Sequence, residues 1–105
     1  MQFKQVDYPR GTEKTIAGHK IIFAPLPLGA IEKYQDQLSG GNVPIATILD
    51  IAHISLKRNY PDITRDFIAD EILDLANMEE VLGLVTNSSG LTHSGEQQTG
   101  EQSGE

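Results

Sequence analysis

The apolar residues of this chain change their spacing near Leu28. Before that point, β-branched and aromatic side chains gather in the run His19–Phe23, which is typical of a pleated, half-buried strand. From Leu28 onward, apolar side chains recur about every 3.6 residues, which is the repeat of an amphipathic helix. We therefore expect an α+β fold that is mainly α, with a short N-terminal β-hairpin followed by about four helices.

The hairpin is predicted over residues 15–23. Gly18 lies between two strand-like runs and can supply the positive φ that a tight turn needs. Pro25 and Pro27 prevent further ladder pairing, because proline lacks a backbone N–H. Residues 1–14 are open to two interpretations, an edge strand or a docked arm.

The first two helices are predicted on either side of a glycine pair. The first begins at Leu28 and ends at Ser39-Gly40-Gly41, and Asn42 is placed to cap the second. Ile51 and Ile54 add an apolar flank to the second helix, beside its main apolar face. Both sides of this helix are therefore expected to be covered, which predicts that it is the central helix of the core.

Two further helices are predicted after a break at Asn59-Tyr60-Pro61-Asp62. Thr64 is expected to cap the third helix, whose apolar positions extend to Leu75. Asn77-Met78-Glu79-Glu80 resembles a capping box at the start of the fourth helix, with the Glu80 carboxylate reaching back to the cap. Gly90 is well placed to end that helix.

The chemistry changes abruptly after Leu91. Residues 92–105 contain no aliphatic or aromatic side chain, so they cannot bury enough apolar surface to offset the entropy lost on ordering. We divide the chain into an N-terminal arm or edge strand (1–14), a compact, mainly helical domain (15–91) and a disordered, polar, acidic tail (92–105).

The charges are unevenly distributed along the chain. All eight lysine and arginine residues lie at or before Arg65, and nine of the fifteen acids follow it. A C-terminal part with no positive charge repels phosphate backbones, so no nucleic acid is expected as a partner. Lys57 and Arg58 are expected either to compensate the C-terminal end of the second helix or to dock a protein.

A helix–turn–helix DNA reader is the other arrangement that these basic residues suggest, because Lys57, Arg58 and Arg65 bracket the turn between two helices. The second of those helices, however, carries Asp66, Asp70, Glu71 and Asp74. Four carboxylates on the helix that would enter the major groove argue against DNA recognition. The acids are interpreted as a solvated face.

No residue pattern predicts an active site, a cofactor or a metal site. The chain has no cysteine, and its three histidines have no second ligand at metal-binding spacing, apart from a weak pairing of His53 with Asp50. No nucleotide-binding or nucleophile motif occurs. No apolar run approaches the roughly 20 residues of a membrane span, and the N-terminus lacks the apolar region of a signal peptide. We expect a non-enzymatic protein in the cytoplasm, with no membrane partner.

Two runs of sequence resemble small tail assembly chaperones of long-tailed phages. The first is Gly18-His19-Lys20-Ile21-Ile22-Phe23-Ala24-Pro25-Leu26-Pro27-Leu28, followed by an amphipathic helix. The second is Ser55-Leu56-Lys57-Arg58-Asn59-Tyr60-Pro61-Asp62-Ile63-Thr64, continued by residues 73–82 and closing at Ser89-Gly90-Leu91. The resemblance covers residues 15–91, and a globular domain with a polar tail is compatible with the short form of this family.

The resemblance implies a helper in phage tail morphogenesis. Such chaperones bind the tape measure protein and recruit tail tube subunits around it, tend to self-associate, and are absent from the mature virion. For this chain it implies action in the cytoplasm of a bacterial host. Two alternatives stay open: a small phage regulatory or anti-host protein that binds a host enzyme, and a minor structural virion protein.

A partner would need an apolar stripe that the monomer leaves partly exposed. Each apolar candidate for this stripe can also be a core residue. The two basic candidates lie at the C-terminal end of the second helix. The candidate protein-binding residues are Ile51, Ile54, Lys57, Arg58, Val81, Leu82 and Val85.

Overall fold

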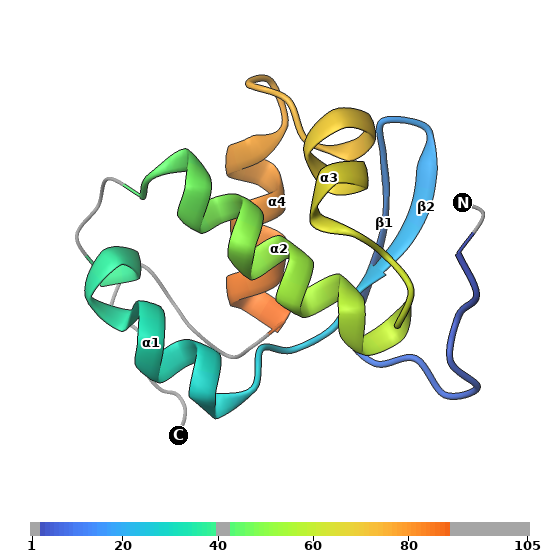
Figure 1. The fold of residues 1–105 in the computed structure, drawn as a ribbon, viewed down its shortest axis with the longest axis horizontal. Coiled ribbons are helices and arrows are strands. Elements are labelled where there is room, and N and C mark those ends of the chain that lie inside the picture. Colours follow the sequence, from blue (N-terminus) through green and yellow to red (C-terminus); the bar gives the residue numbers. More distant parts are fainter. Residues whose placement is uncertain (1–2, 40–42, 89–105) are drawn as a thin grey trace.

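The structure, a computed structural model, describes residues 3–39 and 43–88. A β-hairpin is followed by helical segments, so the predicted α+β, mainly α fold is confirmed (Figure 1). The predicted tail (92–105) and the helix end predicted at Gly90 lie outside the described residues. The elements are β1 (Thr12–Ile16), β2 (His19–Phe23), α1 (Leu28–Ser39), α2 (Ile45–Asn59), α3 (Arg65–Phe67), the π-helix η1 (Ile68–Ile72) and α4 (Met78–Ser88).

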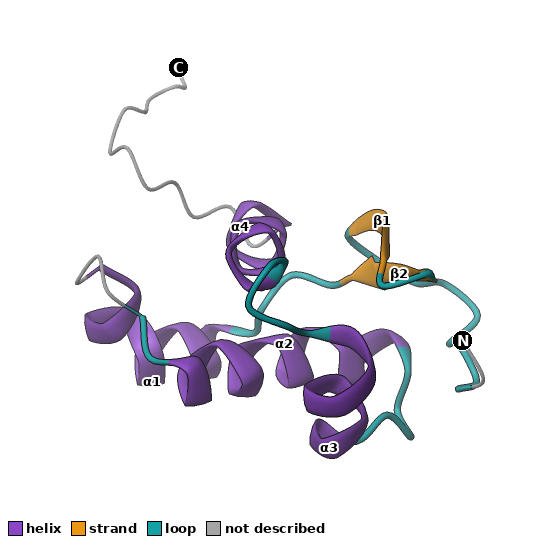
Figure 2. Cartoon of the chain, turned by 90° about the horizontal axis from the view of Figure 1, so that it is seen from above, coloured by secondary structure: helices purple, strands orange, loops and turns teal. Residues whose placement is uncertain are grey.

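The elements form two layers. Figure 2 shows α1, α2 and α3 in one layer, with α4 and the hairpin lying across them in the other. Helix α2 contacts α1, α3, η1, α4 and β2. The prediction that this helix is the centre of the core is therefore confirmed.

The core lies between the two layers and is mostly aliphatic. Burying a side chain of this size stabilises the fold by roughly 1.5–3 kcal/mol relative to leaving it in water. Its larger members come from β2, α2, η1 and α4, so the core is complete only when these elements are packed together. The largest fully buried apolar side chains are Phe23, Ile21, Ile51, Leu56, Ile68, Ile72, Val81 and Val85.

The hairpin is antiparallel, with Thr12 opposite Phe23 and Ile16 opposite His19. Its two-residue turn has positive φ at both positions, 51° at Ala17 and 80° at Gly18. The predicted turn at Gly18 is confirmed, and the two positive φ values are those of the type I′ turn that matches strand twist.

Residues 3–11 form a docked arm that leads into β1. Strand β1 begins at Thr12, so the expected boundary between residues 14 and 15 falls inside the hairpin. The Val6 backbone N–H donates to the Asn59 carbonyl oxygen at 2.8 Å, and the ring of Phe3 meets that of Phe67 edge-on, with the centroids 4.8 Å apart. The arm is thereby fixed to the C-terminal end of α2 and to α3.

Helix α2 begins at Ile45, with Pro44 in an extended conformation at the capping position. The predicted cap, Asn42, lies outside the described residues. At the other end, the Tyr60 N–H donates to the Leu56 carbonyl at 2.8 Å, and Pro61 follows. The helix stops here because the residue before a proline avoids helical geometry.

The third predicted helix is shorter than expected and continues from an α-helix into a π-helix. Thr64 caps it as predicted, since its Oγ1 accepts from the Phe67 N–H at 3.1 Å. From Ile68 the chain is a π-helix, which ends at an extended Leu73 whose N–H donates to the Ile68 carbonyl at 2.8 Å. Leu75, predicted on the apolar face of this helix, lies beyond its end, so that prediction was wrong.

Candidate functional site

An apolar groove of about 180 Å³ opens between the start of α2 and the connection from η1 to α4. This groove is the strongest candidate for a functional site in the described part of the chain. The first turns of α2 form one wall, and the residues after η1 form the other. Its lining residues are Ile45, Ile48, Leu49, Ala69, Leu73, Asp74, Leu75 and Met78.

A paired turn shapes the second wall. The Asp74 N–H donates to Asn77 Oδ1 and the Asn77 N–H donates to Asp74 Oδ1, both at 2.9 Å. The Asn77 side-chain N–H also donates to the Ile72 carbonyl at 2.8 Å. These bonds satisfy the backbone in a non-helical path, because short polar side chains compete with the helical ladder. Leu75, in the middle of this turn, is held away from the core.

The capping box predicted for α4 at residues 77–80 is not formed. The Asn77 N–H, which Glu80 was expected to accept from, is bonded to the Asp74 carboxylate instead. Glu80 forms an exposed ion pair with Lys14 of β1, with Nζ and Oε2 3.6 Å apart. The start of α4 is thus fixed by the preceding turn, which is also a wall of the groove.

Two large apolar side chains on the groove are exposed. Leu75 is 78% exposed and Ile45 is 56% exposed, one on each wall. Covering such side chains would contribute roughly 25 cal/mol for each Å² of apolar surface removed from water. A concave apolar surface with exposed apolar residues at its edge is one form that protein- and ligand-binding sites take.

The groove is not where the sequence placed the binding surface. Ile51, Val81 and Val85 are fully buried, and Ile54 and Leu82 are partly buried and packed against the core. Ile51, Val81 and Val85 are therefore corrected to core residues, in a helix α2 that is in contact with both α4 and β2, whereas Ile54 and Leu82 keep part of their surface exposed.

Lys57 and Arg58 lie at the opposite end of α2 from the groove. Both are exposed in the last turn of the helix, where positive charge interacts favourably with the helix dipole. Arg58 also donates through Nη1 to the Pro25 carbonyl at 2.6 Å, which joins α2 to the segment after the hairpin. The structure does not bring these two residues together with the apolar groove.

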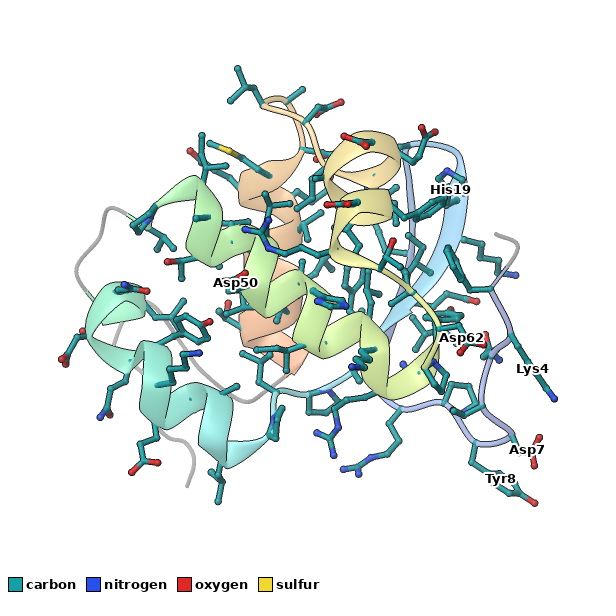
Figure 3. The ribbon with its side chains drawn as sticks, in the orientation of Figure 1. Lys4, Asp7, Tyr8, His19, Asp50 and Asp62 are labelled. Atoms are coloured by element: carbon teal, nitrogen blue, oxygen red, sulfur yellow. The ribbon has the colours of Figure 1, made fainter. Side chains whose placement is uncertain are left out.

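The weak metal pair considered for Asp50 and His53 is not formed. Asp50 lies midway along α2 (Figure 3), where its Oδ1 accepts from Arg65 Nε at 2.7 Å and its Oδ2 accepts from the Tyr34 hydroxyl at 3.2 Å. The His53 Nε2 lies 3.2 Å from the Ile63 carbonyl oxygen. Residues 3–39 and 43–88 contain no group of three potential metal ligands.

The residues that make the groove carry a weak signal in the sequence. Leu75 fits the helical repeat of the preceding segment, and that repeat predicts a buried residue where the structure has an exposed one. The contrary signal is the spacing of Asp74 and Asn77, two residue types that form local turns through their side chains. Ile45 has no such signal, because its exposure depends on which elements pack beside the first turn of α2.

No family model, curated protein or solved structure matches this chain. None of the helices in the described residues has the length and apolar character that a membrane span requires.

Proposed function

We propose that this chain is a non-enzymatic tail assembly chaperone that holds a segment of the tape measure protein in the groove. One observation carries the proposal. Ile45 and Leu75 expose large apolar side chains on the two walls of a single groove, in a domain whose other apolar residues are mostly buried. The exposed area gains free energy when another chain covers it.

The geometry favours a side chain presented by a helix. An apolar cavity of about 150 Å³ holds one benzene ring, so a groove of about 180 Å³ accepts a single leucine- or phenylalanine-sized side chain. Ile45 and Leu75 then provide contacts for the neighbouring turns of the same helix. This is the helix-in-groove mode, in which anchors at helical spacing enter an apolar groove.

The resemblance supplies the identity of the partner and the role. Its two runs, residues 18–28 and 55–64, both contribute to the packing of α2 against the hairpin segment, through the Arg58 bond to Pro25 and a 2.7 Å bond from Ser55 Oγ to the Ala24 carbonyl. Tape measure proteins have long helical segments that suit the groove. Recruitment of tail tube subunits, action in the host cytoplasm and absence from the mature virion belong to the same proposal.

The test is co-expression of the full chain with overlapping segments of the tape measure protein encoded by the same genome. One segment is expected to co-purify with the native chain. Leu75→Ser should abolish that capture. Leu28→Ser is the matched control, because Leu28 is similarly exposed, at 82%, but lies on α1 away from the groove.

Two results would count against the proposal. Equal capture by the native chain and Leu75→Ser would mean that the groove is not the binding site. Detection of the chain in purified virions by mass spectrometry, in amounts comparable with tail components, would make it a structural protein instead.

A further inference from the structure

Among the described residues, the one charged side chain that lines the groove is negative, and two further carboxylates directly follow lining residues in the sequence. Asp74 is a lining residue, Asp70 directly follows the lining residue Ala69, and Glu79 directly follows the lining residue Met78. All three carboxylates are exposed. Asp70 is on η1, Asp74 is in the turn and Glu79 is on α4, and these are the segments that supply the wall opposite α2.

No cation of the described residues neutralises these three carboxylates. Arg65 lies against the α2 wall, where its Nη2 donates to the Ala46 carbonyl at 3.4 Å, but its charge is matched by Asp50 at 2.7 Å. Lys14 is matched by Glu80 at 3.6 Å. From Asp66 to Ser88 the sequence has no lysine or arginine at all.

From this combination we infer that the groove selects a cationic amphipathic helix, whose apolar side chain enters the groove while lysine or arginine side chains beside it meet Asp70, Asp74 and Glu79. This inference rests on the proposed function and names the chemistry of the segment that is bound. An acidic helix with the same apolar residues is rejected, because like charges are brought together at the rim.

The proposed contacts are at the rim, so they act mainly on specificity. Exposed ion pairs contribute little individually and are screened by salt. Three of them together are expected to separate a cationic helix from an anionic one by about tenfold or more in affinity. The apolar anchor should supply the part of the affinity that salt does not remove.

The probes are designed peptides of about 18 residues, long enough to form a helix when docked. One is an amphipathic leucine–lysine helix, the second has glutamate in place of every lysine, and the third has the leucine–lysine composition in a non-amphipathic order. Binding to the full chain is measured by fluorescence anisotropy at low ionic strength and near 0.15 M, where the screening length is about 8 Å. The leucine–lysine amphipathic peptide is expected to bind at least about tenfold more tightly than either of the others.

A matched pair of double variants separates a local effect from a general attraction to a negatively charged protein. Asp70→Asn with Glu79→Gln removes two charges next to the groove, and Glu32→Gln with Asp36→Asn removes the same two kinds of charge from exposed positions on α1. The first double variant should weaken the leucine–lysine peptide about fivefold or more, and the second by less than about twofold. Circular dichroism of each variant checks that the fold is kept.

Three outcomes would overturn the inference. Equal weakening by the two double variants would mean that only net charge attracts the peptide. Loss of binding in Leu75→Ser with no effect of Asp70→Asn/Glu79→Gln would reject the charge selection and leave the proposed docking in the groove intact. A dimer in sedimentation analysis that Leu75→Ser dissociates would make a second copy the occupant of the groove.

Discussion

Asn59 and Arg10 are joined by two reciprocal hydrogen bonds. The Arg10 N–H donates to Asn59 Oδ1 at 3.1 Å, and Asn59 Nδ2 donates to the Arg10 carbonyl at 2.8 Å. The same Nδ2 group donates to the Ile22 carbonyl at 2.9 Å. The buried side-chain amide of Asn59, at the end of α2, therefore joins both the arm and β2 to this helix. It donates to and accepts from backbone groups, as the backbone of a neighbouring strand does.

Replacing Asn59 by alanine should destabilise the domain by about 2–4 kcal/mol. Three hydrogen bonds are lost at once, and the partners at Arg10 and Ile22 are left without their bonding group in a partly buried place. The measurement is urea unfolding followed by circular dichroism. Ser39→Ala is the control, because Ser39 makes one exposed bond, of 3.3 Å, to Asp36, and it should change stability by less than about 0.5 kcal/mol. Similar losses in the two variants would show that the amide does not hold the arm.

Replacement by alanine should change the stability of the domain in opposite directions at Gly11 and Gly29. A Cβ at Gly11 would lie 1.8 Å from the Phe23 carbonyl oxygen, and φ there is 109°, so Gly11→Ala should cost about 3 kcal/mol or more. Gly29 lies in α1, where an added methyl group would meet no other atom within 4 Å, so Gly29→Ala should stabilise by about 0.5–1 kcal/mol. Thermal unfolding measures both, and a tolerated Gly11→Ala would contradict the close approach of the arm to β2.

The hairpin turn contains a strained alanine. Ala17 adopts φ 51°, a left-handed conformation that costs an L-residue roughly 1 kcal/mol and that asparagine adopts more easily. Ala17→Asn creates an Asn-Gly turn and should stabilise by about 0.5–1 kcal/mol, which raises the melting temperature by a few degrees. Ala17→Val should lower it, since β-branched residues are worst in this conformation. If asparagine and valine had the same effect, the positive φ at this turn would be in doubt.

Ile51 and Leu75 are two apolar residues for which truncation should have very different effects. Ile51 is fully buried, so Ile51→Ala should destabilise by about 2–5 kcal/mol through lost burial and the cavity left behind. Leu75→Ala removes an exposed side chain and should change stability by less than about 0.5 kcal/mol. Chemical denaturation compares them. Comparable losses would place Leu75 in the core and remove the exposed wall of the groove.

The sequence predicted the elements better than it predicted their environment. The β-branched run before Leu28 and the glycine at 18 predicted the turn and β2, because local chemistry decides a tight turn, but β1 begins earlier than expected, at Thr12. The helical repeat predicted α2 and its two apolar sides, but not which of the flanking residues are fully buried. Ile51 is fully buried and Ile54 only partly, and that difference depends on how the other elements pack on α2.

The site illustrates the same limit at one residue. Leu75 has the spacing of a core residue, yet the paired side chains of Asp74 and Asn77 turn the backbone before it can join the helix. The repeat and the local turn chemistry favoured different structures here, and the turn prevailed. Exposed residues that result from such a conflict cannot be found from periodicity, although they are the ones available to a partner.

The bonds between Asn59 and Arg10 also set an order of events during synthesis. The two residues are 49 positions apart in the chain, so the arm is translated well before its acceptor exists. The bonds of the arm to Asn59 cannot form until the last turn of α2 has emerged from the ribosome. Contacts between residues far apart in the sequence are slow to form in folding. A nascent chain stalled before Asn59 lacks the side chain to which the backbone of Arg10 bonds.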